Sequence, residues 1–404
     1  MNGTKNEYAS LLKHYPDVDA NRPAIHDCLQ RAGTPLFICE SAILQDRYRC
    51  LADSLANHWG PSVIGYSFKT NYLVAQSMIL QELGACAEVV SAREYAMARS
   101  LGFAGNSIIF NGPHKPDESL KAAISDGAMI FVNDQDELDR LIALASVTEG
   151  PVDIGMRTGM TLPKLGHSRF GFSLENGEAL SGIDAIRRTS NVRLVGLHTH
   201  LYGDTDDPTI YGVAATRIAE FAVQNVPDHE RNLRFLDLGG GYPAHGPKPK
   251  SRSEWDPQPI DIYIQSITDG LKVVFDDPLQ RPSLVVEPGR YLTCDGIVLV
   301  TRVGHVKERD GVQIVNCDGS ISMMPLTHYC PQIIRPFSPE LVAREGTGVD
   351  SIIHGSTCRE NDRMYEGAFP PVQRGDYLIH FAAGAYNSNL SPDFIFAAPG
   401  MEVI

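Results

Sequence analysis

The stretch Val63-Ile64-Gly65-Tyr66-Ser67-Phe68-Lys69-Thr70-Asn71 places a single lysine at the end of a short apolar run. The run has the length and the β-branched and aromatic content of a buried strand. Folds built on parallel strands keep their chemistry at the carboxyl ends of those strands. A lysine in that position is either a salt-bridged surface residue or an amine kept for covalent chemistry, and taken alone the first explanation is favoured.

Outward from this stretch, apolar runs alternate with segments of helical periodicity. The predicted strands are 63–68, 87–90, 107–110, 129–132, 152–157, 193–200, 234–238 and 283–287. The predicted helices are 72–83, 92–101, 118–125, 134–145, 175–188, 208–224 and 260–275. Strands separated by helices in this way indicate an α/β fold, a (β/α)8 TIM-type barrel, with a doubly wound open sheet as the alternative.

After Arg290 the pattern changes to short strand-like runs separated by Gly, Pro and Asp. These runs are 296–303, 311–317, 332–335, 351–354, 376–381 and 393–396. They predict a mainly antiparallel β domain, which the early run Pro35–Cys39 could join. The expected organisation is an N-terminal segment at 1–45 that belongs to the β domain, a barrel at 46–289 and a C-terminal β domain at 290–404.

The length and amino-acid composition are those of an ordinary globular protein. Its 404 residues, 43% hydrophobic and 21% charged, are enough for two domains. A net charge of −14 argues against binding to nucleic acid or to acidic membranes. No apolar run has the length of a signal-peptide core or a membrane span. The eight cysteines include no C-x-x-C pair, so reduced thiols in a cytoplasmic protein are expected.

Polar residues follow the predicted strands, and a barrel would bring them to one mouth. They are Lys69, Arg157, His198, His200, Gly239-Gly240-Gly241 and Glu287, with Arg290 close behind. The two histidines could bind zinc, but no third ligand with metal spacing accompanies them. Glycines after a buried strand expose backbone N–H groups that suit a phosphate. An amine, a phosphate cradle, an imidazole and a carboxylate together suit pyridoxal 5′-phosphate (PLP).

Several motifs, in the same order, resemble those of the fold type III (alanine-racemase-fold) PLP-dependent amino-acid decarboxylases, which include ornithine and diaminopimelate decarboxylases. The motifs are YSFKTN (66–71), AEVVSAREY (87–95), SRFGF (168–172), HTHLYG (198–203), DLGGGYP (237–243), EPGR (287–290), GSTCRENDR (355–363) and GAY (384–386). The resemblance runs from about Pro35 to Phe396, which is nearly the whole chain.

The resemblance implies a role for each matching residue. Lys69 would form the Schiff base with the cofactor, and His200 would stack on its ring. Glu287 would face the pyridine nitrogen, where alanine racemases place an arginine, and an acid there favours decarboxylation. The residues expected to hold the phosphate are Gly239, Gly240, Gly241, Arg290 and Tyr386, and Gly289 is a further expected cofactor-binding residue. Cys358 would reach the neighbouring subunit's site and donate a proton to Cα, which implies a head-to-tail homodimer with shared active sites.

The residues expected to meet the substrate depart from the family pattern. After the interface cysteine, ornithine decarboxylases carry Asp and diaminopimelate decarboxylases carry Glu, whereas this chain carries Arg359. A cation there would attract an acidic group, so we expect an amino acid with an acidic or bulky polar distal end, as in siderophore or other specialised-metabolite pathways. Glu360 could instead restore recognition of an amine, and Tyr329 is a further candidate substrate-binding residue. The alternatives are a diaminopimelate, ornithine or lysine decarboxylase, an amino-acid racemase and a non-catalytic homologue.

Overall fold

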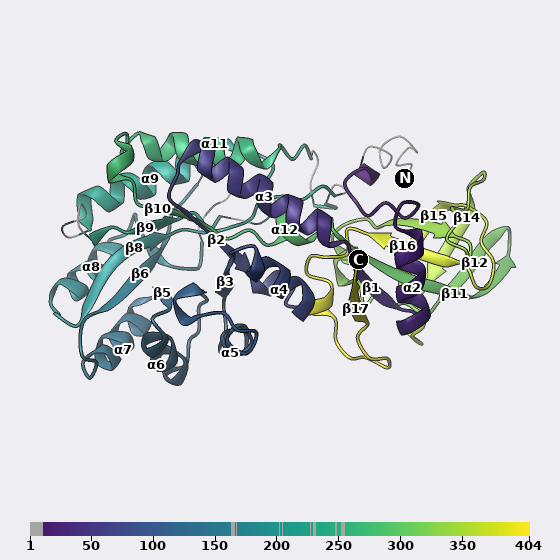
Figure 1. Cartoon of the computed structure of the whole chain (residues 1–404), viewed down its shortest axis with the longest axis horizontal. Coiled ribbons are helices and arrows are strands. Elements are labelled where there is room, and N and C mark those ends of the chain that lie inside the picture. Colours follow the sequence, from purple (N-terminus) through teal and green to yellow (C-terminus); the bar gives the residue numbers. More distant parts are fainter. Residues whose placement is uncertain are drawn as a thin grey trace.

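The computed structural model describes residues 11–404 apart from 163–165, 167, 202, 204, 227, 229–231, 247–248 and 252–254. Two sheets lie next to each other along the long axis of the molecule (Figure 1). One is a barrel surrounded by helices, and the other is a sheet against which the N-terminal helix α2 (Arg22–Ala32) packs.

Eight parallel strands close into the barrel because the first strand pairs with the last. They are β2 (Ser62–Ser67), β3 (Cys86–Val89), β4 (Ile108–Phe110), β5 (Met129–Val132), β6 (Val152–Gly159), β8 (Val192–His198), β9 (Phe235–Asp237) and β10 (Ser283–Val286). β10 pairs in parallel with both β9 and β2, which leaves no open edge. The closed barrel confirms the predicted fold and rules out the open sheet.

Helices alternate with these strands as predicted. They are α4 (Val74–Glu82), α5 (Ala92–Ser100), α6 (Asp117–Asp126), α7 (Gln135–Ala145), α8 (Glu178–Arg187), α9 (Thr209–Asn225) and α11 (Ile260–Lys272). The helix α3 (Ser41–His58), which was not predicted, packs against α11 (Figure 1), where Ser54 Oγ donates to Asp261 Oδ1 at 2.8 Å. The two-residue strand β7 (Phe172–Ser173) pairs in parallel with the end of β6, and the short helix α12 (Arg290–Thr293) follows β10. Within the described part of the chain, no helix is both long and apolar enough to cross a bilayer.

Aromatic side chains fill the interior of the barrel. Phe131 and Phe235 pack edge to face there, with ring centroids 5.4 Å apart. Two glycines on neighbouring strands make room for them. A Cβ on Gly155 would lie 2.3 Å from the Phe131 ring, and one on Gly196 would lie 2.0 Å from the Phe235 ring. Because the interior is packed, the polar chemistry belongs to the mouth at the carboxyl ends of the strands.

The second sheet is mainly antiparallel, as predicted. Its strands are β1 (Leu36–Cys39), β11 (Ile297–Arg309), β12 (Val312–Cys317), β13 (Ile333–Phe337), β14 (Val349–His354), β15 (Arg363–Phe369), β16 (Tyr377–Phe381) and β17 (Gly400–Val403). β1 pairs antiparallel with β11 and parallel with β17, so the early run does join this sheet. The expected strand at 393–396 is wrong, since only an isolated bridge between Phe394 and Phe396 forms there. The domain boundaries given above stay predictions.

Candidate active site

Lys69 lies in the 3₁₀ turn Phe68–Thr70 that follows β2, at the mouth of the barrel. Its Nζ is 2.6 Å from Glu88 Oε2 on β3 and donates to Ser67 Oγ at 2.7 Å. Burial disfavours the charged amine, but the carboxylates of Glu88 and Glu287 outweigh this effect and raise the pKa of Lys69 above its usual value. The lysine is therefore an ammonium held against a carboxylate.

Glu287 follows β10 and has an exposed fraction of only 2%. Asn111, which follows β4, donates its Nδ2–H to Glu287 Oε1. His198 Nε2 and His200 Nδ1 lie 3.4 Å and 3.7 Å from Oε2. Burial opposes ionisation, but the two histidines and the charge of Lys69 hold the pKa of Glu287 well below its usual value. Glu287 is therefore ionised.

Two buried neighbours of Glu287 are neutral. Burial and then the charge of Glu287 raise the pKa of Asp237 well above its usual value, so Asp237 carries the proton of this pair. The Gly239 N–H donates to Asp237 Oδ1 at 2.8 Å. Burial lowers the pKa of His198 to about 4, and its neutral ring packs on Phe131 with centroids 5.0 Å apart.

The three consecutive glycines follow β9 and contact the residues that follow β8 and β10. Gly239 and Gly241 have positive φ angles of 64° and 92°. A Cβ on Gly239 would lie 2.7 Å from His200 Nδ1, and one on Gly240 would lie 2.1 Å from the Glu287 carbonyl oxygen. The Gly240 N–H donates to His200 Nδ1 at 3.1 Å and so fixes this ring. The turn thus needs glycine both for its conformation and for its close packing.

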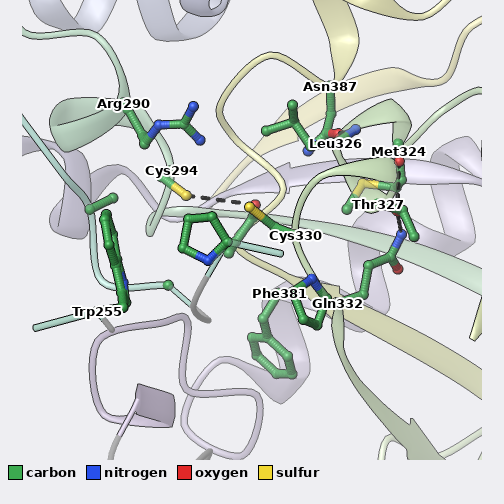
Figure 2. A pocket seen from close by; sticks show the side chains of 15 residues that line it. Trp255, Arg290, Cys294, Met324, Leu326, Thr327, Cys330, Gln332, Phe381 and Asn387 are labelled. Carbon is green, nitrogen blue, oxygen red and sulfur yellow. Dashed lines mark hydrogen bonds between the residues drawn. The ribbon is translucent and has the colours of Figure 1, made fainter. Parts of the chain in front are cut away.

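The turn that begins at Glu287 packs on the Lys69 turn. A Cβ on Gly289 would lie 2.0 Å from Thr70 Oγ1, and the Tyr386 N–H donates to the Thr70 carbonyl at 2.8 Å. The Arg290 guanidinium lies 5.1 Å from the centre of the Tyr386 ring. Arg290 also lines a pocket of about 60 Å³ (Figure 2) together with Trp255, Cys294, Cys330, Phe381 and Asn387. The residues predicted for the cofactor therefore lie on turns that contact one another.

The residues predicted to act across a dimer or on the substrate lie on the surface of the single chain. Cys358 and Glu360 are exposed, and Tyr329 has an exposed fraction of 67%. The Arg359 guanidinium lies 5.8 Å from the centre of the Phe394 ring. These side chains do not belong to the buried Lys69–Glu287 cluster.

Three members of the buried cluster were not singled out from the sequence. They are Glu88 on β3, Asn111 after β4 and Asp237 at the end of β9. The signal that identified Lys69 and Glu287 was present for them too, because each lies at the carboxyl end of a barrel strand.

His198, His200 and Glu287 bring ligand atoms within 4.8 Å of one another. This spacing could suit a metal ion. However, Glu287 already accepts a hydrogen bond from Asn111, and His200 Nδ1 accepts one from the Gly240 N–H, so we assign the three residues to an organic cofactor instead.

Comparisons with known proteins agree with this geometry. Residues 44–294 match the family described as "Pyridoxal-dependent decarboxylase, pyridoxal binding domain". The chain is 25% identical to a diaminopimelate decarboxylase of Halalkalibacterium halodurans over 378 residues, covering 90% of this chain and 84% of the relative. It is 28% identical to that of Actinosynnema pretiosum over 380 residues, covering 90% and 82%.

Solved structures share the fold. A diaminopimelate decarboxylase from M. jannaschi superposes with a TM-score of 0.82 at 21% identity, covering 94% of this chain and 88% of that one. The lysine/ornithine decarboxylase of Vibrio vulnificus, complexed with putrescine, superposes with a TM-score of 0.78 at 23% identity, covering 95% and 98%.

The cluster fits PLP. An amine that can bond to an aldehyde, an ionised carboxylate and a glycine turn lie on adjoining turns of one mouth. Buried Thr70 Oγ1 and Asn111 Oδ1 have no hydrogen-bond partner among the described residues, so polar atoms remain for a bound group. With the family match extending over most of the chain, the protein belongs to the pyridoxal-dependent decarboxylases, which are PLP-dependent carboxy-lyases.

Proposed function

We propose that the chain decarboxylates a diamino acid of the diaminopimelate, ornithine and lysine class. The observation that carries the decarboxylase part is the buried, ionised Glu287, because an acid at the pyridine nitrogen strengthens electron withdrawal from Cα. The names of the curated relatives and of the Vibrio vulnificus structure support the diamino class. They favour it over the acidic or bulky polar substrate that the sequence suggested from Arg359.

Each residue at the mouth of the barrel has its own proposed role. When bound, PLP supplies a conjugated ring that takes up the electron pair left as carbon dioxide departs. Lys69 would hold the cofactor covalently, and Glu88 Oε2, 2.6 Å from its Nζ, would accept the proton that the lysine must lose before it reacts. Glu287 would hold the pyridine nitrogen of the cofactor, and His200 would support the face of its ring. The glycine turn at 239–241, Arg290 and Tyr386 would hold the phosphate.

The surface loop offers one carboxylate that suits an amine at the distal end of the substrate. The Arg359 guanidinium lies 5.8 Å from the Phe394 ring centre, and its Nε donates to Asn361 Oδ1 at 3.2 Å. Both partners are neutral, so they position the guanidinium and leave its charge in place. The adjacent Glu360 is exposed and offers a carboxylate to an ammonium.

We also propose a homodimer in which each site includes the partner's Cys358 loop. The loop is exposed yet ordered, since Asp362 Oδ1 accepts the Ile321 N–H at 2.8 Å and its Oδ2 accepts the Thr357 N–H at 3.0 Å. Mixing two inactive variants, Lys69→Ala and Cys358→Ala, should restore activity, because a mixed dimer has one site with both native residues. Failure of the mixture, with exchange of subunits demonstrated, would rule out shared sites.

The substrate is tested by carbon dioxide release from the PLP-loaded protein. The panel sets meso-diaminopimelate, ornithine and lysine against amino acids with acidic or conjugated distal ends. Release from a diamino acid that disappears in Lys69→Ala supports the proposal. Release only from acidic substrates would return the assignment to Arg359, and racemisation without release would overturn the decarboxylase.

Two adjacent substitutions refine this test. Glu360→Gln should raise KM for the diamino substrate about tenfold, the usual effect of losing a hydrogen bond to a charged group. The matched variant Arg359→Gln should leave KM nearly unchanged. The opposite result would show that position 359, rather than 360, meets the substrate.

A further inference from the structure

Asn111 connects two carboxylates that come from different strands of the barrel. It follows β4, has an exposed fraction of 2%, and donates from one amide nitrogen to Glu287 Oε1 and, at 3.4 Å, to Glu88 Oε1. In the barrel the order is β10, β2, β3, β4, so the Asn111 side chain reaches across two intervening strands. We propose that Asn111 is a positioning residue that sets the spacing between the carboxylate at the Lys69 amine and the carboxylate at the pyridine nitrogen.

The orientation of the Asn111 amide follows from its neighbours. If the oxygen occupied the place of the nitrogen, it would face two carboxylates with no proton between them. The nitrogen has two hydrogens, which is the number that two acceptors require. Serine at this position would offer one donor, leucine none, and aspartate would add a third negative charge.

A buried ion pair holds the turn that carries Asn111. Gly112, the next residue, has a positive φ of 96°. Lys115 Nζ donates to the Gly112 carbonyl at 2.8 Å and to both oxygens of Glu137 at 2.9 Å. The side chains of Lys115 and Glu137 are 0% and 3% exposed. The amide is therefore fixed by packed structure rather than by a mobile loop, as a positioning role requires.

Charged and titratable groups from several elements surround Asn111 and the two carboxylates that it contacts. Glu287 after β10 and Glu88 on β3 contact it, and the groups that interact with these two carboxylates are Lys69 after β2, Asp237 on β9, His198 on β8 and Arg157 on β6. Among them, Glu88 and Glu287 accept hydrogen bonds from Asn111 directly. An aspartate at 111 would therefore be repelled when ionised and would regain one donor when protonated.

The experiment uses the full-length protein stripped of PLP and titrated with PLP by absorbance, so no substrate is needed. This makes it independent of the substrate proposal, although it rests on the roles given to Lys69 and Glu287. We expect Asn111→Leu and Asn111→Asp to weaken PLP binding by about tenfold or more, and Asn111→Ser to fall between them and the native protein. Lowering the pH from about 8 to about 6 should restore part of the affinity of Asn111→Asp but not of Asn111→Leu.

The control is Asn106→Asp, which adds the same charge at an exposed residue just before β4 and should bind PLP as the native protein does. Melting of each stripped variant reports folding. If Asn111→Leu does not fold, the comparison of Asn111→Ser with Asn111→Asp still decides. Native PLP affinity in these variants, or equal weakening of Asn111→Asp and Asn111→Leu at every pH, would overturn the positioning role.

Discussion

A single methyl group added at Gly240 tests how the mouth of the barrel is built. The Cβ of alanine would lie 2.1 Å from the Glu287 carbonyl oxygen, whereas ordinary van der Waals contact begins at 3.4 Å. The obstacle is backbone, so no side chain can rotate away. Either the glycine turn or the Glu287 turn must therefore move by about 1 Å, a displacement that commonly costs about 100-fold in rate.

The two turns are also hydrogen-bonded, because the Glu287 N–H donates to the Gly239 carbonyl at 2.8 Å. Displacement of either turn therefore changes both the glycine turn, which we propose binds the phosphate, and the position of the Glu287 carboxylate. For Gly240→Ala we expect PLP affinity to fall by about tenfold or more and kcat/KM to fall by about 100-fold.

The assay is a PLP titration of the stripped protein, followed by rate measurement at saturating PLP. Gly150→Ala is the matched control, because its Cβ would have no atom within 4 Å and its φ is not in the positive range. The melting temperature of both variants separates misfolding from local displacement. Native PLP affinity and native rate in a folded Gly240→Ala would refute the close packing described here.

Two further predictions concern stability. Lys115→Met should lower the free energy of unfolding by about 3–5 kcal/mol, because it leaves the buried Glu137 unpaired, and adding Glu137→Leu should recover much of the loss. Denaturant unfolding measures both, and simple additivity would contradict the pairing. Burial lowers the pKa of His198 to about 4 and that of His380 to about 3, so at mildly acidic pH the unfolded chain binds protons that the folded chain does not. The free energy of unfolding should therefore fall as pH drops from about 6.5 to 4, by about 1.4 kcal/mol per unit for each histidine, and His380→Gln should flatten this slope.

The barrel was predictable because its strands are buried on both faces and read as continuous apolar runs. β15 (Arg363–Phe369) was missed because it lies at the end of its sheet, and its charged residues and Gly367 hide the strand pattern. The opposite error occurred at 393–396, where the aromatic run predicted a strand that does not form. Phe394 and Phe396 are partly exposed and pair only with each other, so apolar content there does not reflect a sheet.

Lys69 and Glu287 were predictable because each lies at a strand end within a motif, YSFKTN or EPGR, to which the family resemblance gives a role. Glu88, Asn111 and Asp237 were not, because an acid or an amide at a strand end is common and gains meaning only from its partner. Asn111 meets Glu287 because β4 and β10 belong to one closed barrel, which depends on the register of every strand between them. Such pairings lie beyond what local sequence can show.

The pairing of β1 determines when the second sheet can form during translation. Leu36 pairs with Val300, and Cys39 pairs with Ile297 and Val403, so both partner strands leave the ribosome after the whole barrel. The apolar segment Leu36–Cys39 therefore has no strand to pair with while the barrel is synthesised. During that interval it is an unpaired edge, the kind of segment that chaperones bind and that aggregates when they do not. Yield in the cell should therefore depend on how quickly β11 and β17 arrive to cover it.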